Sequence, residues 1–318
     1  MKQLENTVSC KNIFLQSLID KDSLKESELS YHAHTVIQNF VTGMEKFGDV
    51  TIAKKPCDVI LTRRKDKQAQ KVVPHVSNRS VENINLKVHT TVNTMGDQTW
   101  GCYTLLDGRM AFTFYNSKTV WVFKTDGSKD FEVKTPIFPF DISYISENNT
   151  LAVTTVQSER KCITVIDIQN KEIITEIQVE SYYYGITVKE NKFICSVAKN
   201  GIKMINPYKN SISDLVRDNL HCYETNSVIC SDMQGIVQWT FKIESVLTGP
   251  RGISVDNDGN VYAVGKASNN VVVRSDGQQH KEILTASDGL SNPNALDYCK
   301  STNQLLVANF SNSAMILL

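Results

Sequence analysis

Four short β-rich segments separated by turn sequences recur along the chain from about residue 84 to its end. The clearest copy spans residues 247–284, LTGPRGISVDNDGNVYAVGKASNNVVVRSDGQQHKEIL, with strands expected at GISV, NVYAVG, VVVRS and KEIL. The same order recurs at residues 99–134, 138–179, 183–216, 219–247 and 292–318. Four strands in a repeat of roughly 40 residues are typical of one blade of a β-propeller. The six copies therefore predict an all-β, six-bladed β-propeller.

The last copy ends at Leu318 after its third strand and lacks an outer strand. The segment INLKVHTT, residues 84–91, precedes the first copy and has the alternation of a β-strand. A sheet edge left unpaired is a site for unwanted pairing with other chains. We therefore expect residues 84–91 to pair with AMILL at the C-terminal end, which closes a propeller over residues 84–318.

The N-terminal part has a different pattern. Apolar residues recur three or four positions apart from Leu29 to Phe47, and Gly48 follows them where a helix cap is expected. This spacing predicts a helix over residues 11–47. A narrow apolar stripe needs a partner helix, so residues 1–48 are expected to be the end of a coiled coil that makes a homodimer. The alternative is a helix that lies against the downstream domain.

Residues 49–83 form a basic connector between these two parts. From residue 50 to residue 87 there are nine Lys and Arg side chains and three Asp and Glu side chains. A solvated linker is one interpretation of this composition. An electrostatic contact with RNA or with an acidic partner is the other.

The charge, the apolar segments and the cysteine spacing of the chain narrow the class of protein. The formal net charge is +0, which argues against a strongly basic nucleic-acid binder overall. The start, MKQLENTVSC, lacks the apolar run of a signal peptide, and no segment has the ~20 apolar residues of a membrane helix. No two of the eight cysteines are spaced as C-x-x-C, so no RING or B-box zinc module can be assembled. We expect a cytoplasmic protein with mostly buried, reduced cysteines.

The segments PRGISVDNDGNVYAV and NNVVVRSDG resemble the NHL repeat, whose pattern runs P-x-G-I-x-V-D-x-x-G-N-I-Y-V-A-D and then N-x-R-V-x-V-F. The resemblance is specific over residues 249–277. In the other copies only the order of strands and turns is similar. It departs from the pattern at Gly265 and Lys266, where Ala-Asp is usual. The matching residues are Pro250, Gly252, Ile253, Val255, Asp256, Gly259, Asn260, Val261, Tyr262, Val264, Asn270 and Val271.

A helix, a basic connector and this propeller look like the C-terminal part of a tripartite-motif protein of the NHL type. The resemblance implies an antiparallel coiled-coil dimer and a propeller that recruits a protein or an RNA. Full-length members of that family carry a RING and B-boxes ahead of the coiled coil and act as ubiquitin ligases. Since those modules are missing from this sequence, ligase activity does not carry over.

The sequence lacks the recognisable catalytic and metal-binding motifs. In the DNDGN segment Gly259 is fourth from Asp256 rather than sixth, and Ala267 stands where an EF-hand needs Glu, so we expect a hairpin turn. Neither G-x-S-x-G nor H-E-x-x-H occurs. A metal-dependent propeller hydrolase is a less favoured alternative, because the residues before the first strands are poor ligands for a hard cation. We expect no catalytic residue, no metal and no cofactor.

What remains is a binding rim. The residues just before each first strand and the loops between second and third strands should emerge at one end of a propeller. Aromatic and arginine side chains surrounded by amides are typical of recognition surfaces. The expected rim residues are Trp100, Tyr115, Asn116, Lys118, Phe140, Arg160, Tyr184, Lys199, Asn200, Arg251, Lys266, Asn269, Asn270, Asn294, Asn309 and Asn312.

The partner expected at this rim is a protein or a peptide, bound by a non-catalytic scaffold. From residue 99 onward there are twenty Lys and Arg and twenty-three Asp and Glu, a balance that disfavours general phosphate binding. A single-stranded RNA stacked on the aromatic residues is the alternative.

Overall fold

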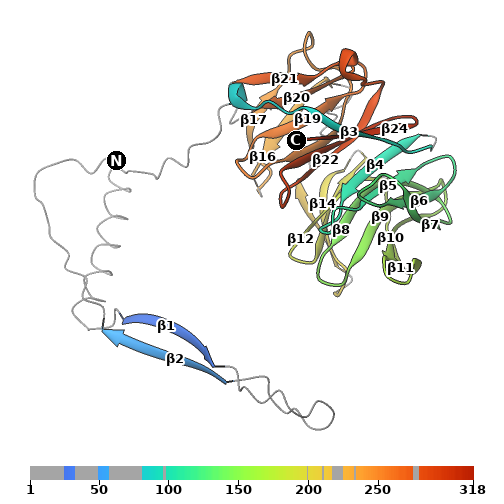
Figure 1. Cartoon of the computed structure of the whole chain (residues 1–318). Helices are drawn as coiled ribbons and strands as arrows, with labels where there is room; N and C mark the ends of the chain where they lie inside the picture. The colour runs from blue at the N-terminus through green and yellow to red at the C-terminus, as the bar shows by residue number, and fades with distance from the viewer. Residues whose placement is uncertain are drawn as a thin grey trace, which may run out of the picture. The chain divides into compact units, whose positions relative to one another are not determined.

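The computed structural model divides the chain into two compact units, residues 1–74 and residues 75–318 (Figure 1). It describes residues 25–32, 49–56, 81–95, 98–198, 200–209, 211–216, 225–232, 234–274 and 279–318.

The described part of the first unit is a two-stranded antiparallel sheet. Strand β1 (Lys25–His32) pairs with β2 (Asp49–Pro56), and the register places Leu29 opposite Ile52 and Tyr31 opposite Val50. The helix predicted over residues 11–47 is therefore wrong for residues 25–32. Alternation of apolar residues in steps of two competes with the helical spacing there, and pairing with β2 favours the strand. The rest of the predicted helix and coiled coil lies outside the described residues.

The second unit is built from four-stranded antiparallel meanders, each running from an inner first strand to an outer fourth strand. The β4–β7 blade comprises β4 (Thr99–Thr104), β5 (Met110–Phe114), β6 (Thr119–Phe123) and β7 (Lys129–Lys134). The β8–β11 blade comprises β8 (Phe138–Ile145), β9 (Thr150–Val156), β10 (Lys161–Asp167) and β11 (Glu172–Gln178). The β12–β15 blade comprises β12 (Tyr183–Lys189), β13 (Lys192–Val197), β14 (Gly201–Asn206) and β15 (Ser211–Val216). The β18–β21 blade comprises β18 (Pro250–Val255), β19 (Val261–Gly265), β20 (Asn270–Arg274) and β21 (His280–Leu284).

The C-terminal blade takes its outer strand from the start of the unit. It comprises β22 (Pro293–Cys299), β23 (Gln304–Asn309), β24 (Ser313–Leu317) and then β3 (Val88–Asn93). In this pairing Ala314 lies opposite Val92, and Lys87 and Leu318 exchange backbone hydrogen bonds of 3.0 and 3.1 Å. The strand expected at residues 84–91 is thus centred a few residues later. The segment before it contains the 3₁₀ turn η1 (Val81–Asn83), whose Val81 is buried.

The copy expected at residues 219–247 is not a complete blade. Within the described residues it is a two-stranded sheet, β16 (Val228–Ser231) with β17 (Val237–Phe241). The fourth strand expected at ESVL is instead a turn, in which the N–H of Val246 donates to the carbonyl of Ile243 at 2.9 Å. The structure therefore has five four-stranded blades rather than six in its described part, because this shortest copy turns directly into β18.

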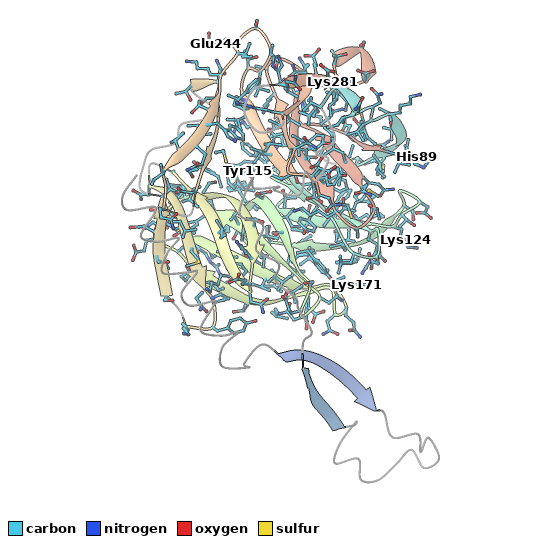
Figure 2. All side chains as sticks on the ribbon, turned by 90° about the vertical axis from the view of Figure 1, so that its left-hand side faces the viewer. His89, Tyr115, Lys124, Lys171, Glu244 and Lys281 are labelled. Carbon is cyan, nitrogen blue, oxygen red and sulfur yellow. The ribbon has the colours of Figure 1, made fainter. Side chains whose placement is uncertain are left out.

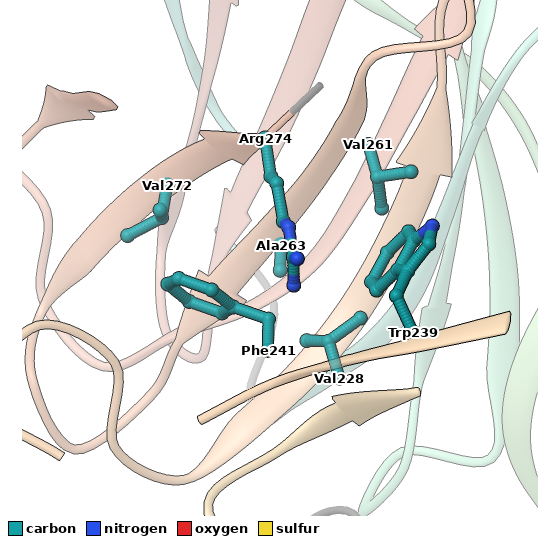
Figure 3. Close-up of a pocket in the computed structure, with 7 residues that line it drawn as sticks. All are labelled: Val228, Trp239, Phe241, Val261, Ala263, Val272 and Arg274. Atoms are coloured by element: carbon teal, nitrogen blue, oxygen red, sulfur yellow. The ribbon is translucent and has the colours of Figure 1, made fainter. Parts of the chain in front are cut away.

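The two-stranded sheet packs on the β18–β21 blade through a small apolar cluster (Figure 3). Phe241 and Val228 contact the buried Ala263 and Val272 of that blade. The guanidinium carbon of Arg274 lies 4.3 Å from the Trp239 ring centroid and 5.3 Å from that of Phe241. This shallow pocket is part of the packing between two sheets, and its lining is almost entirely apolar.

The hydrophobic core lies between neighbouring blades rather than within one of them. Every residue of β5, β9 and β20 is buried, because both faces of a middle strand are covered by adjacent sheets. One cluster, for example, joins Phe112 and Phe114 of the β4–β7 blade to Ala295 and Leu306 of the C-terminal blade. The part of the chain that the structure describes contains no helix long and apolar enough to cross a membrane.

Candidate functional site

The first strand of each four-stranded blade has a β-bulge near its start. The bulges fall between Thr99 and Cys102, Pro139 and Ile142, Tyr183 and Ile186, Pro250 and Ile253, and Pro293 and Ala295. A bulge bends its strand and changes the direction of the extra side chain. The bulged segments contain the predicted rim residues Trp100, Phe140, Tyr184, Arg251 and Asn294, so one repeated backbone feature places all five.

Hydroxyl groups on the second strands connect the bulges of neighbouring blades. The hydroxyl of Thr113 in β5 donates to the carbonyl of Phe140 in the next blade. The hydroxyl of Thr154 in β9 accepts the N–H of Asp141 at 3.0 Å and donates to the carbonyl of Tyr184 at 2.9 Å. Both threonines are buried, so these bonds fix consecutive rim residues relative to one another.

Within the part of the chain that the structure describes, six aromatic side chains gather at this rim and are called the Trp100 cluster: Trp100, Tyr115, Phe138, Phe140, Tyr184 and Phe310. The centroid of the Trp100 ring lies 4.8 Å from that of Phe140 and 5.7 Å from that of Tyr115. Tyr115 stacks on Phe138 at 4.6 Å, and Phe140 lies 5.2 Å from Tyr184. Phe310, from the turn after β23, lies 6.3 Å from Trp100. Tyr184 is 44% exposed, so the cluster reaches the surface.

Among the described residues, three cations lie over these rings. The guanidinium carbon of Arg251 is 5.2 Å from the Trp100 centroid, and the ammonium of Lys266 is 5.8 Å from Trp100 and 3.8 Å from Phe310. The ammonium of Lys118 lies 4.4 Å from the Phe138 centroid. All are within the range of a cation–π interaction. The site therefore combines a broad aromatic surface with positive charge contributed by separate blades.

Buried polar atoms without partners lie next to Trp100. Within the described residues, Trp100 Nε1, Thr99 Oγ1 and Asn294 Oδ1 have no hydrogen-bond partner, although Asn294 Nδ2 donates to the carbonyl of Thr99 at 2.9 Å. An unsatisfied buried polar atom costs about 1–3 kcal/mol. Other described residues with such atoms include Trp121 and Asn260, so the unpaired atoms beside Trp100 add to the description of the site without by themselves assigning it a function.

Three predicted rim amides are part of the scaffold instead. Asn270, Asn294 and Asn309 are each at most 3% exposed. Asn270 donates to Glu282 and to the carbonyl of Val246, and Asn309 accepts the N–H of Ser291 at 2.9 Å. Their burial does not fit the expectation that they contact a partner, because the short loops between blades need these amides for their own backbone groups.

The remaining predicted residues are dispersed. Asn116 and Asn312 are exposed, and Arg160 is exposed and pairs with Glu176. Asn200 donates to Ser181, Asn269 accepts the N–H of Asn292 at 2.6 Å, and Lys199 lies outside the described residues. None of these described residues lies over a ring of the Trp100 cluster.

Phe138 and Phe310 belong to the cluster but were not among the predicted rim residues. Phe310 lies in the same NFSN loop as two predicted amides, so its loop position was the available signal. Phe138 lies two positions before Phe140 in β8, and both side chains are half-buried, so its nearness to Phe140 in the sequence was the available signal.

The DNDGN segment is the turn between β18 and β19. Asp256 accepts the N–H groups of Asp258 and Asn260 at 2.9 and 2.8 Å, and its other oxygen accepts from Asn260 Nδ2 and the Tyr262 hydroxyl. Gly259 has φ of 86°, which suits glycine. Both carboxylate oxygens of Asp256 are therefore used by the turn itself.

Two carboxylates on inner strands were missed by sequence reasoning. Asp141 in β8 accepts the N–H of Ile186 at 2.9 Å, and Asp297 in β22 accepts the N–H of Thr104 at 2.8 Å. Desolvation, followed by the charge of Asp297, raises the pKa of Asp141 to about 7, although hydrogen bonds from backbone N–H groups oppose the shift. Desolvation likewise raises the pKa of Asp297 to about 6. In the described part of the chain no three His, Cys, Asp or Glu residues are grouped as a metal site.

Comparison with solved structures identifies the architecture. Virginiamycin B lyase from Staphylococcus aureus aligns with a TM-score of 0.54 at 13% identity, covering 73% of this chain and 99% of that one. The WD40 β-propeller domain of Doa1 aligns with a TM-score of 0.53 at 14% identity, covering 73% and 97%. The chain is a β-propeller.

The glutaminyl cyclase of Myxococcus xanthus is also similar, with a TM-score of 0.51 at 10% identity and coverage of 73% and 95%. No protein-family profile and no curated protein sequence matches the chain. A lyase, a cyclase and a WD40 domain share this fold, so the fold alone does not select a function. Any function must therefore come from the side chains at the site.

Proposed function

We propose that this chain is a non-catalytic recognition scaffold whose Trp100 cluster binds a protein or peptide partner. The observation that carries the proposal is the convergence of six aromatic rings and three cations at one rim. Aromatic and arginine side chains dominate the energetics of protein interfaces. The WD40 domain of Doa1 is a precedent for the fold only, although propellers commonly serve as interaction scaffolds.

More specifically, we propose that the propeller is the substrate-recruiting part of an NHL-type tripartite-motif protein that forms dimers. The similarity of residues 249–277 to the NHL pattern supports it. The β-bulges that orient the rim residues occur in all five four-stranded blades, which is consistent with a surface shared by the whole ring.

Single-stranded RNA is a second candidate partner. Arg251 and Lys266 over the ring of Trp100 form a surface on which a base can stack. The slight excess of acidic residues from residue 99 onward makes RNA the weaker candidate.

Selection from a displayed random peptide library tests the proposal. The wild-type propeller should enrich a defined set of peptides, and the variant Tyr184→Ala should fail to enrich them. Tyr208→Ala is the matched control, because Tyr208 is 73% exposed in the β14–β15 turn at the opposite end of the same blade. Equal enrichment by wild type and Tyr184→Ala, or enrichment of nothing by wild type, would contradict the proposal.

A further inference from the structure

Two cations from one blade lie near the same indole ring. Arg251 lies in the bulge of β18, and Lys266 follows β19 directly, so the β18–β19 hairpin brings them to the same end of the blade. Their charged groups lie 5.2 and 5.8 Å from the centroid of Trp100, which belongs to β4. The Lys266 ammonium also lies 3.8 Å from the centroid of Phe310.

This arrangement places like charges close together. Burial lowers the pKa of Lys266, and the positive charge of Arg251 lowers it further. Within the described residues, Lys266 makes no ion pair with a carboxylate. Two like charges in a partly desolvated site attract an anionic group, because the anion removes their mutual repulsion.

We propose that the pair formed by Arg251 and Lys266 binds a carboxylate of an acidic segment in a protein partner, and that the adjacent rings bind the apolar or aromatic side chain next to it. This inference rests on the proposed function of the Trp100 cluster and adds the chemical class of its partner. Trp100, Tyr115, Phe140 and Tyr184 form the neighbouring aromatic surface, with ring centroids 4.8 to 5.7 Å apart.

Charge distribution favours an acidic peptide over a nucleic acid. A phosphate backbone needs a groove with positive charges along its length. Among the described residues, two of the three cations that contact the cluster come from one blade and lie beside Trp100 and Phe310, and the third, Lys118, lies over Phe138. A single carboxylate beside an aromatic residue matches this spacing better than an extended polyanion does.

The experiment measures binding of defined polymers to the full chain by fluorescence anisotropy. The probes are a random copolymer of Glu and Tyr, a matched copolymer of Lys and Tyr, and oligouridylate. We expect the Glu–Tyr copolymer to bind, the Lys–Tyr copolymer to bind at least about tenfold more weakly, and binding of the former to weaken as salt increases.

Variants then assign the binding to the two cations. Lys266→Met keeps an unbranched apolar side chain next to Phe310 and removes the charge, and Arg251→Gln removes the second charge. Each should weaken binding of the Glu–Tyr copolymer about tenfold. Lys124→Gln is the matched control, since Lys124 follows β6 at the opposite end of the strand from the Tyr115 loop (Figure 2). The double variant Arg251→Glu with Lys266→Glu should reverse the preference toward the Lys–Tyr copolymer.

The outcomes separate this inference from the function on which it rests. Equal binding of both copolymers, lost in Tyr184→Ala but not in the charge variants, would overturn the anion site and leave the recognition role in place. Binding of oligouridylate without the Glu–Tyr copolymer would overturn the inference in favour of nucleic acid. If none of the three probes binds while selected library peptides still bind, the partner is not acidic. The proposed recognition role would then remain in place.

Discussion

Asp141 of β8 accepts a hydrogen bond of 2.9 Å from the backbone N–H of Ile186 in β12, so a carboxylate of one blade holds the inner strand of the next. Asp297 does the same for Thr104 across the junction between the C-terminal blade and the β4–β7 blade. These are polar connections between blades whose remaining contacts are mainly apolar. They link the stability of the ring to the protonation of two acids.

The stability of the propeller should therefore depend on pH through Asp141. Its pKa is raised from 3.8 to about 7, so the folded state binds a proton that the unfolded state releases. The resulting stabilisation is complete below the unfolded pKa and is lost as pH rises through about 7. Asp141→Asn keeps an acceptor and removes the titration. Between pH 5 and pH 8 the thermal midpoint of the variant should fall less than that of the wild type, by roughly 2–4 °C. Identical pH profiles for the two proteins would exclude this role.

Thr154→Val should destabilise the propeller although the two side chains have nearly the same shape. Thr154 is fully buried, and its loss leaves the Asp141 N–H without its acceptor and the Tyr184 carbonyl without its donor. We expect a loss of about 1–3 kcal/mol in the free energy of unfolding, measured in urea. Thr175→Val is the control, because Thr175 is exposed on β11 of the same blade. A loss no larger than that of the control would show that the hydroxyl bonds are dispensable.

Removal of β3 should destabilise the whole second unit. A chain that begins at Val81 keeps η1 and β3, whereas a chain that begins at Thr94 leaves β24 as an unpaired edge. The shorter chain also loses the buried Val81 and Val92. Its midpoint of thermal unfolding should be lower on the order of 10 °C, with a greater tendency to aggregate. Equal midpoints would mean that closure by β3 contributes little.

The variant Trp100→Phe should weaken peptide binding without lowering the stability of the propeller. The Nε1 atom of Trp100 is buried without an acceptor among the described residues, so its removal relieves an unfavourable group while an aromatic ring stays in place. We expect unchanged or slightly higher stability in urea, and weaker binding of selected peptides. A large loss of stability would assign Trp100 to packing alone.

Much of the architecture was predictable because strand and turn signals are local. The DNDGN turn, the order of four strands and the rim position of Trp100, Phe140, Tyr184 and Arg251 all follow from the repeat. The incomplete copy was not predictable, since ESVL has β character and only its connection to β18 shows that it turns. In β1 the alternation of two apolar residues was hidden within a longer helical spacing.

The chemistry within the site was less accessible from sequence. Asn270, Asn294 and Asn309 resemble surface amides in sequence, and their burial depends on the loops that fold over them. Asp141 and Asp297 lie in otherwise ordinary strand sequences, and their interaction with backbone groups depends on the packing of blades distant in sequence. Long-range contacts of this kind leave no local pattern.

The most direct test of the central claim is calorimetric titration of a library-selected peptide into three proteins: wild type, Tyr184→Ala and Tyr208→Ala. Recognition at the Trp100 cluster predicts that Tyr184→Ala raises the Kd about tenfold or more, as expected for an aromatic residue at an interface. It also predicts that Tyr208→Ala leaves the Kd unchanged. An unchanged Kd in Tyr184→Ala, or an equal rise in both variants, would contradict the claim.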